Sequence, residues 1–188
     1  MCATVSGRGN HRTSAAALTT GTAAVAAPVS GEHAAMARYA GDSDGFEGDP
    51  WIRWERFTSG DGATDVNYGL GFAHNGANNG WLYAAHGWAA ERLRVSVDSW
   101  PNRHNCRARV WARPVDQGAQ VELQVWDPNG WRILTSTAPW LSSAGYQKIV
   151  TSGVDLTGVP TVYVQAIYGN STGAGRFVRL DDAVLECL

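Results

Sequence analysis

The chain has 188 residues, of which 44% are hydrophobic and only 17% are charged, a length that fits one domain with a tail better than two domains. Its net charge of −2 lacks the strongly basic balance that nucleic-acid binding needs, and no apolar run is long enough to span a membrane. The 22 Gly and nine Trp residues favour many short strands and tight turns, with aromatic side chains left at the surface.

Residues 1–27 have the layout of a secretion signal. Arg8 and Arg12 precede a mildly apolar run over residues 15–27, and Ala24-Val25-Ala26 fits a cleavage site with small residues. We therefore expect a secreted, extracellular protein. The alternatives are a disordered tail, or a start codon placed so that it trims a longer signal.

Residues 28–43 are predicted to form a disordered tail. The first 44 residues contain one Leu and no Ile, Phe or Trp, a composition that buries too little apolar surface to offset the entropy of ordering the chain. The folded domain is accordingly expected over residues 44–188.

From residue 44 onward, apolar and polar residues alternate with the period of a β-strand. The alternation is clearest in four segments, residues 93–97, 108–112, 121–125 and 162–166. Gly, Asn, Asp and Pro separate these segments, and Asp127-Pro-Asn-Gly130 predicts a hairpin turn in which Gly130 adopts a positive φ. No segment has a convincing helical period, so the sequence predicts an all-β, antiparallel sandwich or barrel.

Three cysteines support export. Cleavage of the signal would remove Cys2 and leave the even pair Cys106 and Cys187. Cys106 opens one strand-like segment and Cys187 closes another, so antiparallel pairing of the two would bring the sulfur atoms within bonding distance. Two free buried thiols are the alternative.

Polar and aromatic residues on the non-core side of the strands form a candidate binding surface. Flat aromatic rings can stack on sugar rings, while Arg and Gln supply planar hydrogen-bonding groups. A purely structural surface covered by loops is the alternative. The members are Arg92, Arg94, Arg109, Trp111, Arg113, Glu122, Gln124, Trp126, Tyr163, Gln165 and Arg179.

Both ends of the domain resemble a known family. Gly45-Phe46-Glu47-Gly48 opens it, and the segment from Phe177 through Asp181-Asp182 to Leu185 closes it. This pattern resembles the galactose-binding-like jelly-roll fold shared by many carbohydrate-binding modules, and the resemblance covers residues 44–188.

The resemblance implies two sites. Many such modules hold a structural Ca²⁺ between the first and last strands, at positions that match Glu47, Asp181 and Asp182; pairing of the two Asp residues with Arg, or capping of the final turn, is the alternative. An equivalent of the loop from His74 to Trp81 often shapes one end of the binding site, which adds Asn78, Asn79 and Trp81 as candidates. A turn without a binding role is the other interpretation of that loop.

The expected ligand-binding set combines the strands and this loop. It contains Trp111, Trp126, Arg109, Arg113, Gln124, Tyr163, Asn78, Asn79 and Trp81. The other tryptophans, Trp51, Trp54, Trp88, Trp100, Trp131 and Trp140, are expected mostly at the core ends or at the base of the loops.

The sequence gives little support for catalysis. It contains no His pair with zinc spacing and no phosphate-binding Gly loop followed by Lys. Glu55, Asp61 and Asp65 offer a carboxylate pair for glycoside hydrolysis, but nothing in the sequence sets their spacing. We therefore expect no enzyme activity.

The sequence leaves two functions open. The first is a secreted binding module that recognises a carbohydrate or a cell-surface glycan. The second is an interaction subunit of a secreted protein assembly, docking through the sandwich and its N-terminal tail. The oligomeric state is not determined by either interpretation.

Overall fold

Strands make up nearly all of the regular structure in residues 40–188, the part of the chain that this computed structural model describes. The predicted signal and most of the predicted tail lie outside the described residues. One short 3-10 helix, η1 (Pro50–Ile52), follows the first strand. The strands are β1 (Ala40–Asp44), β2 (Trp54–Gly60), β3 (Ala63–Tyr68), β4 (Asn78–Ala84), β5 (Gly87–Ser96), β6 (Cys106–Pro114), β7 (Ala119–Gln120), β8 (Glu122–Asp127), β9 (Arg132–Thr137), β10 (Trp140–Leu141), β11 (Gln147–Val150), β12 (Thr161–Asn170) and β13 (Arg176–Cys187).

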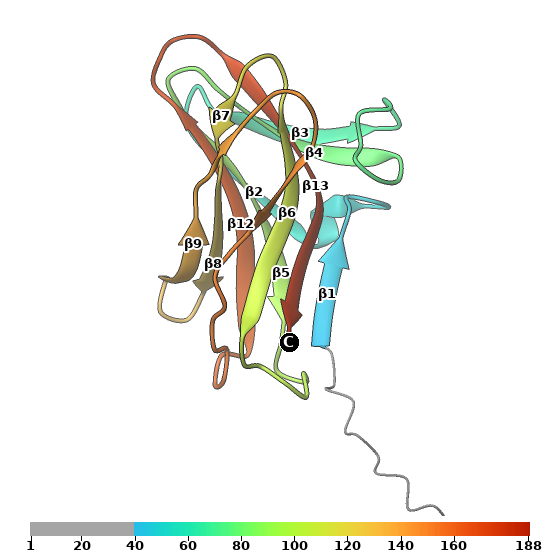
Figure 1. Cartoon of the computed structure of the whole chain (residues 1–188), viewed down its shortest axis with the longest axis vertical. Coiled ribbons are helices and arrows are strands. Elements are labelled where there is room, and N and C mark those ends of the chain that lie inside the picture. Colours follow the sequence, from blue (N-terminus) through green and yellow to red (C-terminus); the bar gives the residue numbers. More distant parts are fainter. Residues whose placement is uncertain (1–39) are drawn as a thin grey trace, which may run out of the picture. The chain divides into compact units, whose positions relative to one another are not determined.

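Two antiparallel sheets pack face to face (Figure 1). Sheet A has the strand order β11-β6-β13-β4-β3, with β1 also paired to β13. Sheet B has the order β2-β5-β12-β8-β9, and β7 and β10 form a separate two-stranded ladder. The predicted all-β antiparallel sandwich is therefore confirmed.

The core lies between the two sheets and consists of the residues that the alternation predicted to point inward. Leu93 and Val95 of β5 are fully buried, as are Leu123 of β8 and Val162 of β12. Sheet A supplies residues such as Ala108 from the other side. Burial of one large aliphatic side chain stabilises the fold by roughly 1.5–3 kcal/mol.

The last strand, β13, organises sheet A. It pairs with β6 along its length, while its other edge pairs first with β4 and then with β1. The register with β6 shifts between Asp181 and Val184, and Asp182 has a positive φ of 46°. This β-bulge lies where β4 gives way to β1, so it re-aims the strand at the change of partner.

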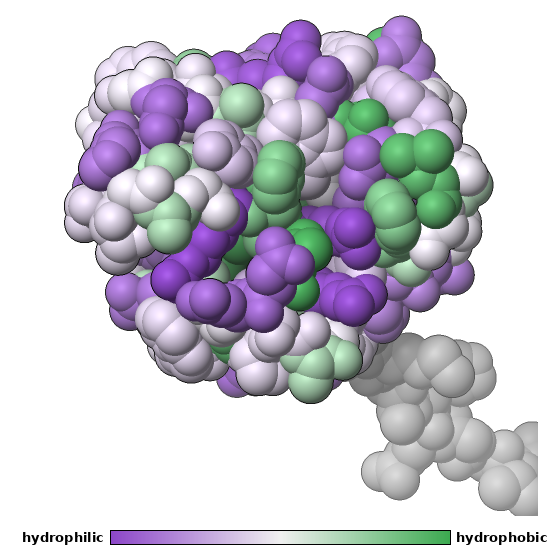
Figure 2. Space-filling model, turned by 90° about the horizontal axis from the view of Figure 1, so that it is seen from above, coloured by the Kyte–Doolittle hydropathy of each residue, from purple (hydrophilic) through white to green (hydrophobic). Residues whose placement is uncertain are grey.

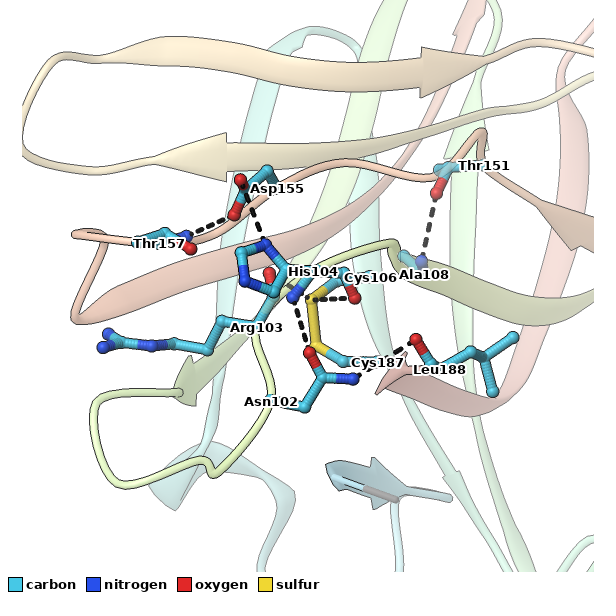
Figure 3. Close-up of a disulfide and its surroundings, with 10 residues drawn as sticks. All are labelled: Asn102, Arg103, His104, Cys106, Ala108, Thr151, Asp155, Thr157, Cys187 and Leu188. Atoms are coloured by element: carbon cyan, nitrogen blue, oxygen red, sulfur yellow. Dashed lines mark hydrogen bonds and ion pairs between the residues drawn. A yellow bond between two sulfur atoms is a disulfide. The ribbon is translucent and has the colours of Figure 1, made fainter. Parts of the chain in front are cut away.

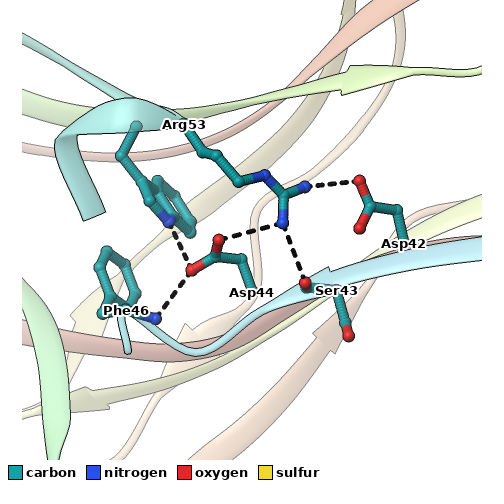
Figure 4. Close-up of polar contacts among 6 residues, drawn as sticks. Asp42, Ser43, Asp44, Phe46 and Arg53 are labelled. Atoms are coloured by element: carbon teal, nitrogen blue, oxygen red, sulfur yellow. Dashed lines mark hydrogen bonds and ion pairs between the residues drawn. The ribbon is translucent and has the colours of Figure 1, made fainter. Parts of the chain in front are cut away.

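The domain begins earlier than the sequence predicted. Residues 40–43, expected in the tail, belong to β1 and pair with the end of β13. Arg53 holds β1 from its other side, because its guanidinium donates to Asp42, to Asp44 and to the carbonyl of Ser43 (Figure 4). A small, polar strand of this kind has no hydrophobic alternation, which is why the sequence did not reveal it.

The predicted hairpin at Asp127–Gly130 is confirmed, with one difference. Strands β8 and β9 pair on either side of the turn, and the Asp127 carboxylate accepts a hydrogen bond from Asn129 N at 3.0 Å. The left-handed conformation falls on Trp131, with φ 47°, whereas we expected it at Gly130.

Cys106 and Cys187 form the predicted disulfide (Figure 3). The two residues are register partners in the antiparallel β6–β13 pair, with Cα atoms 3.9 Å apart. Nearby, the side chain of Asn102 donates to the carbonyl of Leu188 at 3.2 Å. The end of the chain is thus fastened to sheet A by a covalent bond and by hydrogen bonds.

Within residues 40–188, no helix is long and apolar enough to cross a membrane.

Candidate functional site

The predicted binding surface is divided between the two outer faces of the sandwich. Arg109, Trp111 and Arg113 belong to β6, so they lie on the outer face of sheet A. Gln124 and Trp126 of β8, together with Tyr163 of β12, lie on the outer face of sheet B. The alternation correctly identified side chains that point away from the core, but it did not show which sheet each strand joins.

A row of hydrogen-bonded side chains crosses the outer face of sheet B. The guanidinium of Arg92 donates to Gln165 Oε1 from Nε at 2.9 Å and from Nη2 at 2.7 Å. Gln165 Nε2 donates to Gln124 Oε1 at 2.7 Å, and the indole N–H of Trp126 donates to the same oxygen. These contacts join β5, β12 and β8 and fix the planar groups in one orientation.

Aromatic rings surround Arg92 on this face. Its guanidinium carbon lies 4.2 Å from the ring centre of Phe57, 4.9 Å from that of Tyr163 and 5.7 Å from that of Trp126. The Tyr163 hydroxyl donates to Glu55 at 3.2 Å. Burial lowers the pKa of Arg92, and the charges of Glu55 and Tyr163 oppose that shift. Arg92 itself is buried, with 8% of its surface exposed, as are Gln124 and Gln165, whereas the rings of Phe57, Tyr163 and Trp126 are half-buried. We call this rigid surface, formed by the rings around Arg92, the Arg92 face.

A hollow of about 290 Å³ continues the Arg92 face toward the other end of sheet B. Its lining includes Trp88, Glu122 and Ile167. Gly169, which also lines the hollow, is the register partner of Trp88 and has no side chain to fill the space beside it. The hollow therefore presents an exposed indole next to a carboxylate.

The outer face of sheet A is partly covered by the loop between β3 and β4. His74 of this loop stacks on Trp111 with ring centroids 4.1 Å apart, and its Nδ1 lies 2.7 Å from the Asp182 carboxylate. The Tyr146 hydroxyl donates to the carbonyl of Phe72 at 2.8 Å. Trp111 is therefore engaged by the protein's own loop.

The loop separates two hollows on sheet A. The larger, of about 650 Å³, lies beside β1 and is lined by Gly41, Asp42, Ser43, Asp44, Gly45, Asn75, Arg109, Trp111, Lys148, Asp182 and Val184. The smaller, of about 320 Å³, lies on the other side and is lined by Asn67, Phe72, Trp81, Val115, Phe177 and Arg179. Trp81, which we expected to contact ligand, faces the smaller hollow.

Asn78 and Asn79 do not lie in an open loop. Both belong to β4 and are buried, with 9% and 1% of their surface exposed. The Asn78 side chain donates to the carbonyl of Phe46 and accepts from Gly69 N, and Asn79 donates to the carbonyl of Gly80. The Asn/Gly-rich composition that suggested a binding loop here serves internal hydrogen bonding, so these two positions do not fit a ligand contact.

The carboxylates expected to bind Ca²⁺ accept hydrogen bonds from the protein backbone. Glu47 Oε1 accepts from Ala77 N at 2.7 Å and Asn78 N at 3.0 Å. Asp181 Oδ2 accepts from His74 N and Asn75 N, at 2.7 and 3.0 Å. Burial raises the pKa of Asp181 to about 6, against the lowering effect of these hydrogen bonds. Asp181 of β13 thus holds the β3–β4 loop to sheet A, and Glu47 holds the end of this loop and the start of β4 to the segment between β1 and η1.

Carboxylate side chains alone do not complete the expected calcium site, which stays a prediction. Ca²⁺ requires six to eight oxygen ligands, whereas residues 40–188 contain no group of three or more His, Cys, Asp or Glu side chains that could hold a metal ion. Asp182 is paired with His74.

We expect EDTA to leave the melting temperature of the protein unchanged, because backbone N–H groups already satisfy Glu47 and Asp181. Differential scanning calorimetry with EDTA and with added CaCl₂ measures this directly. A melting temperature that rises with CaCl₂ concentration would show that a metal site exists after all.

The acids considered for hydrolysis are not brought together. Glu55 lies on sheet B and Asp65 on sheet A, where Asp65 is 3.5 Å from Arg56. Asp61 accepts hydrogen bonds from Ala85 N and His86 N, which lower its pKa. The geometry offers no carboxylate pair for glycoside cleavage among these three residues.

The remaining tryptophans do not all serve the core. Trp54 is buried and stacks on Phe46 at 4.2 Å, as expected for a core residue. Trp131 and Trp140 are instead about 70% exposed, and Trp88 lies on the outer face of sheet B. The sequence could have shown that Trp88 faces outward, because alternate residues of a strand share a side and Trp88 lies on the same side of β5 as Arg92.

Some apolar side chains are exposed on the surface of the sandwich. Seen from above, green apolar side chains lie among hydrophilic ones, and the surface is hollowed near its centre (Figure 2). Phe72, Phe177 and Leu70 are between 40% and 58% exposed.

Comparison with solved structures identifies the fold. The module TmCBM61 in complex with beta-1,4-galactotriose matches with a TM-score of 0.53 at 17% identity, covering 75% of this chain and 92% of that one. The C-terminal family 22 carbohydrate-binding module of Clostridium thermocellum Xyn10B matches with a TM-score of 0.53 at 10% identity, covering 77% and 91%. The chain has the fold of a carbohydrate-binding module.

A third match of the same fold has a different ligand. The family 11 carbohydrate-binding module from Clostridium thermocellum, in complex with a beta-1,3-1,4-mixed-linked tetrasaccharide, matches with a TM-score of 0.51 at 11% identity, covering 77% of this chain and 94% of that one. No protein-family model matches the sequence, and no curated protein matches it. At these identities the likeness establishes the jelly-roll fold, while the ligand must be argued from the side chains.

Proposed function

We propose that the protein is a non-catalytic module that binds an oligosaccharide on the Arg92 face of sheet B. The observation that carries this proposal is the pair of half-buried rings of Tyr163 and Trp126, which the buried, hydrogen-bonded row of Arg92, Gln165 and Gln124 holds in one orientation. Sugar rings present flat C–H surfaces and vicinal hydroxyls, which match aromatic faces and planar hydrogen-bonding groups.

The side chains of this face are already ordered, which suits a ligand such as a sugar ring whose hydroxyl groups have fixed relative positions. A side chain that is already ordered loses little conformational entropy when the ligand arrives, so more of the interaction energy appears as affinity. The hollow at Trp88 extends the surface by a second position beyond the Arg92 row. The Arg92 face and the hollow together are long enough for a short oligosaccharide rather than a single sugar ring.

Extracellular action is part of the proposal. The Cys106–Cys187 disulfide supports it, since such bonds form and persist mainly in oxidising compartments. Docking on a secreted protein partner through the sandwich and the N-terminal tail remains the alternative.

Substitution of Trp126 by Ala should weaken oligosaccharide binding at least about tenfold, which corresponds to roughly 1.4 kcal/mol. The lost indole supplies a stacking surface and the hydrogen bond to Gln124. Isothermal titration calorimetry with β-1,4-galactotriose and with a mixed-linked β-1,3-1,4-tetrasaccharide provides suitable neutral probes.

Trp131→Asn is the matched control. Trp131 is 70% exposed, lies in the β8–β9 turn away from the Arg92 row, and has a positive φ that Asn tolerates. We expect this variant to bind like the wild type. Equal loss of binding in both variants, or no loss in Trp126→Ala, would contradict a site on the Arg92 face.

A further inference from the structure

The smaller hollow of sheet A has the construction of a second ligand site. Trp81 of β4 and Phe177 of β13 form two of its walls, with ring centroids 5.5 Å apart and planes inclined by 62°. Two rings inclined in this way make a corner that one sugar ring can enter. The volume of about 320 Å³ is at the lower end of the range, roughly 300–1,000 Å³, that is typical of small-molecule sites.

An arginine is fixed at the border of this hollow. The guanidinium carbon of Arg179 lies 3.7 Å from the centre of the Phe72 ring, and Trp81 is its register partner on β4. Phe72 is held in turn by the hydrogen bond from Tyr146 to its carbonyl. Arg179 is therefore positioned by aromatic contacts, which leave its N–H groups available for an acceptor.

The charge of this region is not neutralised within the described residues. Arg113 is the register partner of Arg179 on β6, and neither forms an ion pair with a carboxylate in residues 40–188. The Nε atom of Arg113 is buried and has no hydrogen-bond partner in this part of the protein. Two adjacent arginines repel each other, so an anion placed between or beside them would be stabilised.

The acids on this face do not fill that role. Asp65 pairs with Arg56, Asp182 pairs with His74, and Asp181 accepts backbone hydrogen bonds. Asp116 is exposed in the turn after β6 and attracts Arg179 without reaching ion-pair distance. The positive potential beside the aromatic corner is therefore left for an external group.

We infer that this hollow binds an acidic saccharide, with its ring against Trp81 and Phe177 and its carboxylate or sulfate group against Arg179. The guanidinium fork matches either anion in a bidentate geometry, and the rings supply the stacking surface. This site lies on the opposite sheet from the Arg92 face, so it does not depend on the function proposed there. With both sites occupied, one module would connect two glycan chains.

The test is calorimetric titration of the full chain with three oligosaccharides of equal length: an oligogalacturonate, a sulfated galactan and a neutral galactan. We expect an acidic oligosaccharide to bind at least about tenfold more tightly than the neutral one, with an affinity that falls as salt is added. Arg179→Gln should remove that preference, Arg179→Lys should keep part of it, and Trp81→Ala should weaken binding of the acidic ligand.

Trp126→Ala separates the two sites, because it should reduce neutral-glycan binding and leave acidic binding unchanged. Preference for the uronate or for the sulfated probe identifies the anionic group, and either result supports the inference. Failure of both acidic probes to bind, or unchanged acidic binding in Arg179→Gln, overturns it. Near-ultraviolet circular dichroism shows whether each variant is folded. If Arg179→Gln does not fold, Arg179→Lys, which keeps the positive charge but not the guanidinium fork, still tests the site.

Discussion

Reduction of the Cys106–Cys187 disulfide should lower the free energy of unfolding by about 4 kcal/mol. The bond closes a loop with a sequence separation of 81 residues, and the chain-entropy model gives that magnitude for a loop of this length. For a protein of this size the loss corresponds to a fall in melting temperature of about 10 °C. Urea unfolding with and without a reductant measures the difference.

The folded structure should survive this reduction. Cys106 and Cys187 are already register partners in the β6–β13 ladder, and Cys106 also bridges to Val154. The double variant Cys106→Ala/Cys187→Ala in oxidising buffer should therefore match the reduced wild type, while Cys2→Ala should match the oxidised one. An unfolding midpoint that does not respond to the reductant would show that the bond does not constrain the unfolded chain as argued.

Strand positions could be predicted from the sequence because their signal is local. Alternate residues of a strand face opposite sides, so Val121, Leu123 and Val125 marked a half-buried strand without any knowledge of its neighbours. All three are fully buried in the core. The same logic anticipated the antiparallel pairing of Cys106 with Cys187, since each lies at the end of a recognisable strand.

The candidate site was predicted less well because it depends on contacts between distant segments. Trp111 and Trp126 both lie on the outward side of their own strands, yet β6 joins sheet A and β8 joins sheet B. Period-2 alternation carries no information on which sheet a strand enters. Arg92 and Gln165, 73 positions apart, form the centre of the Arg92 face only because β5 and β12 are neighbours.

Polar residues with structural roles were the other source of error. Asn78 and Asn79 resemble ligand-binding residues in the sequence, but the backbone groups that they satisfy, at Phe46, Gly69 and Gly80, become apparent only in the folded chain. Glu47 and Asp181, the expected calcium ligands, likewise accept hydrogen bonds from the backbone, and whether they also bind Ca²⁺ stays a prediction.

Extending the alternation of Leu93 and Val95 by one more position toward the start of β5 would have predicted that Glu91, a charged residue type, points into the core. It shares the inward side of β5 with Leu93 and Val95, and none of its surface is exposed. Oε1 accepts a hydrogen bond from the Thr64 hydroxyl, whereas Oε2 has no partner in the described part of the chain. Gly80 leaves the space for this carboxyl, because a Cβ there would lie 2.1 Å from Oε2.

The stability of the protein should fall as the pH rises from about 5 to 9, on the order of 4 kcal/mol in total. Desolvation raises the pKa of Glu91 to about 8 in the folded protein, from its usual value of 4.5. Between these two values the folded state holds a proton that the unfolded state has lost, so each increase in pH favours unfolding. Below the lower value both states are protonated, and the full stability is present.

Glu91→Gln should abolish most of this pH dependence above pH 6.5. The amide has nearly the shape of the protonated acid and cannot ionise, so the variant should keep at pH 9 the stability that the wild type has only in acid. The pKa of Asp181 is also raised, to about 6, and its ionisation lowers stability in the same direction. Because this ionisation is largely complete near pH 6.5, the loss of stability between pH 6.5 and 9 is assigned to Glu91. Urea unfolding at pH 5, 6.5 and 9 separates the two contributions. If Glu91→Gln and the wild type lost stability in parallel over the upper interval, the buried carboxyl would not be the group that titrates.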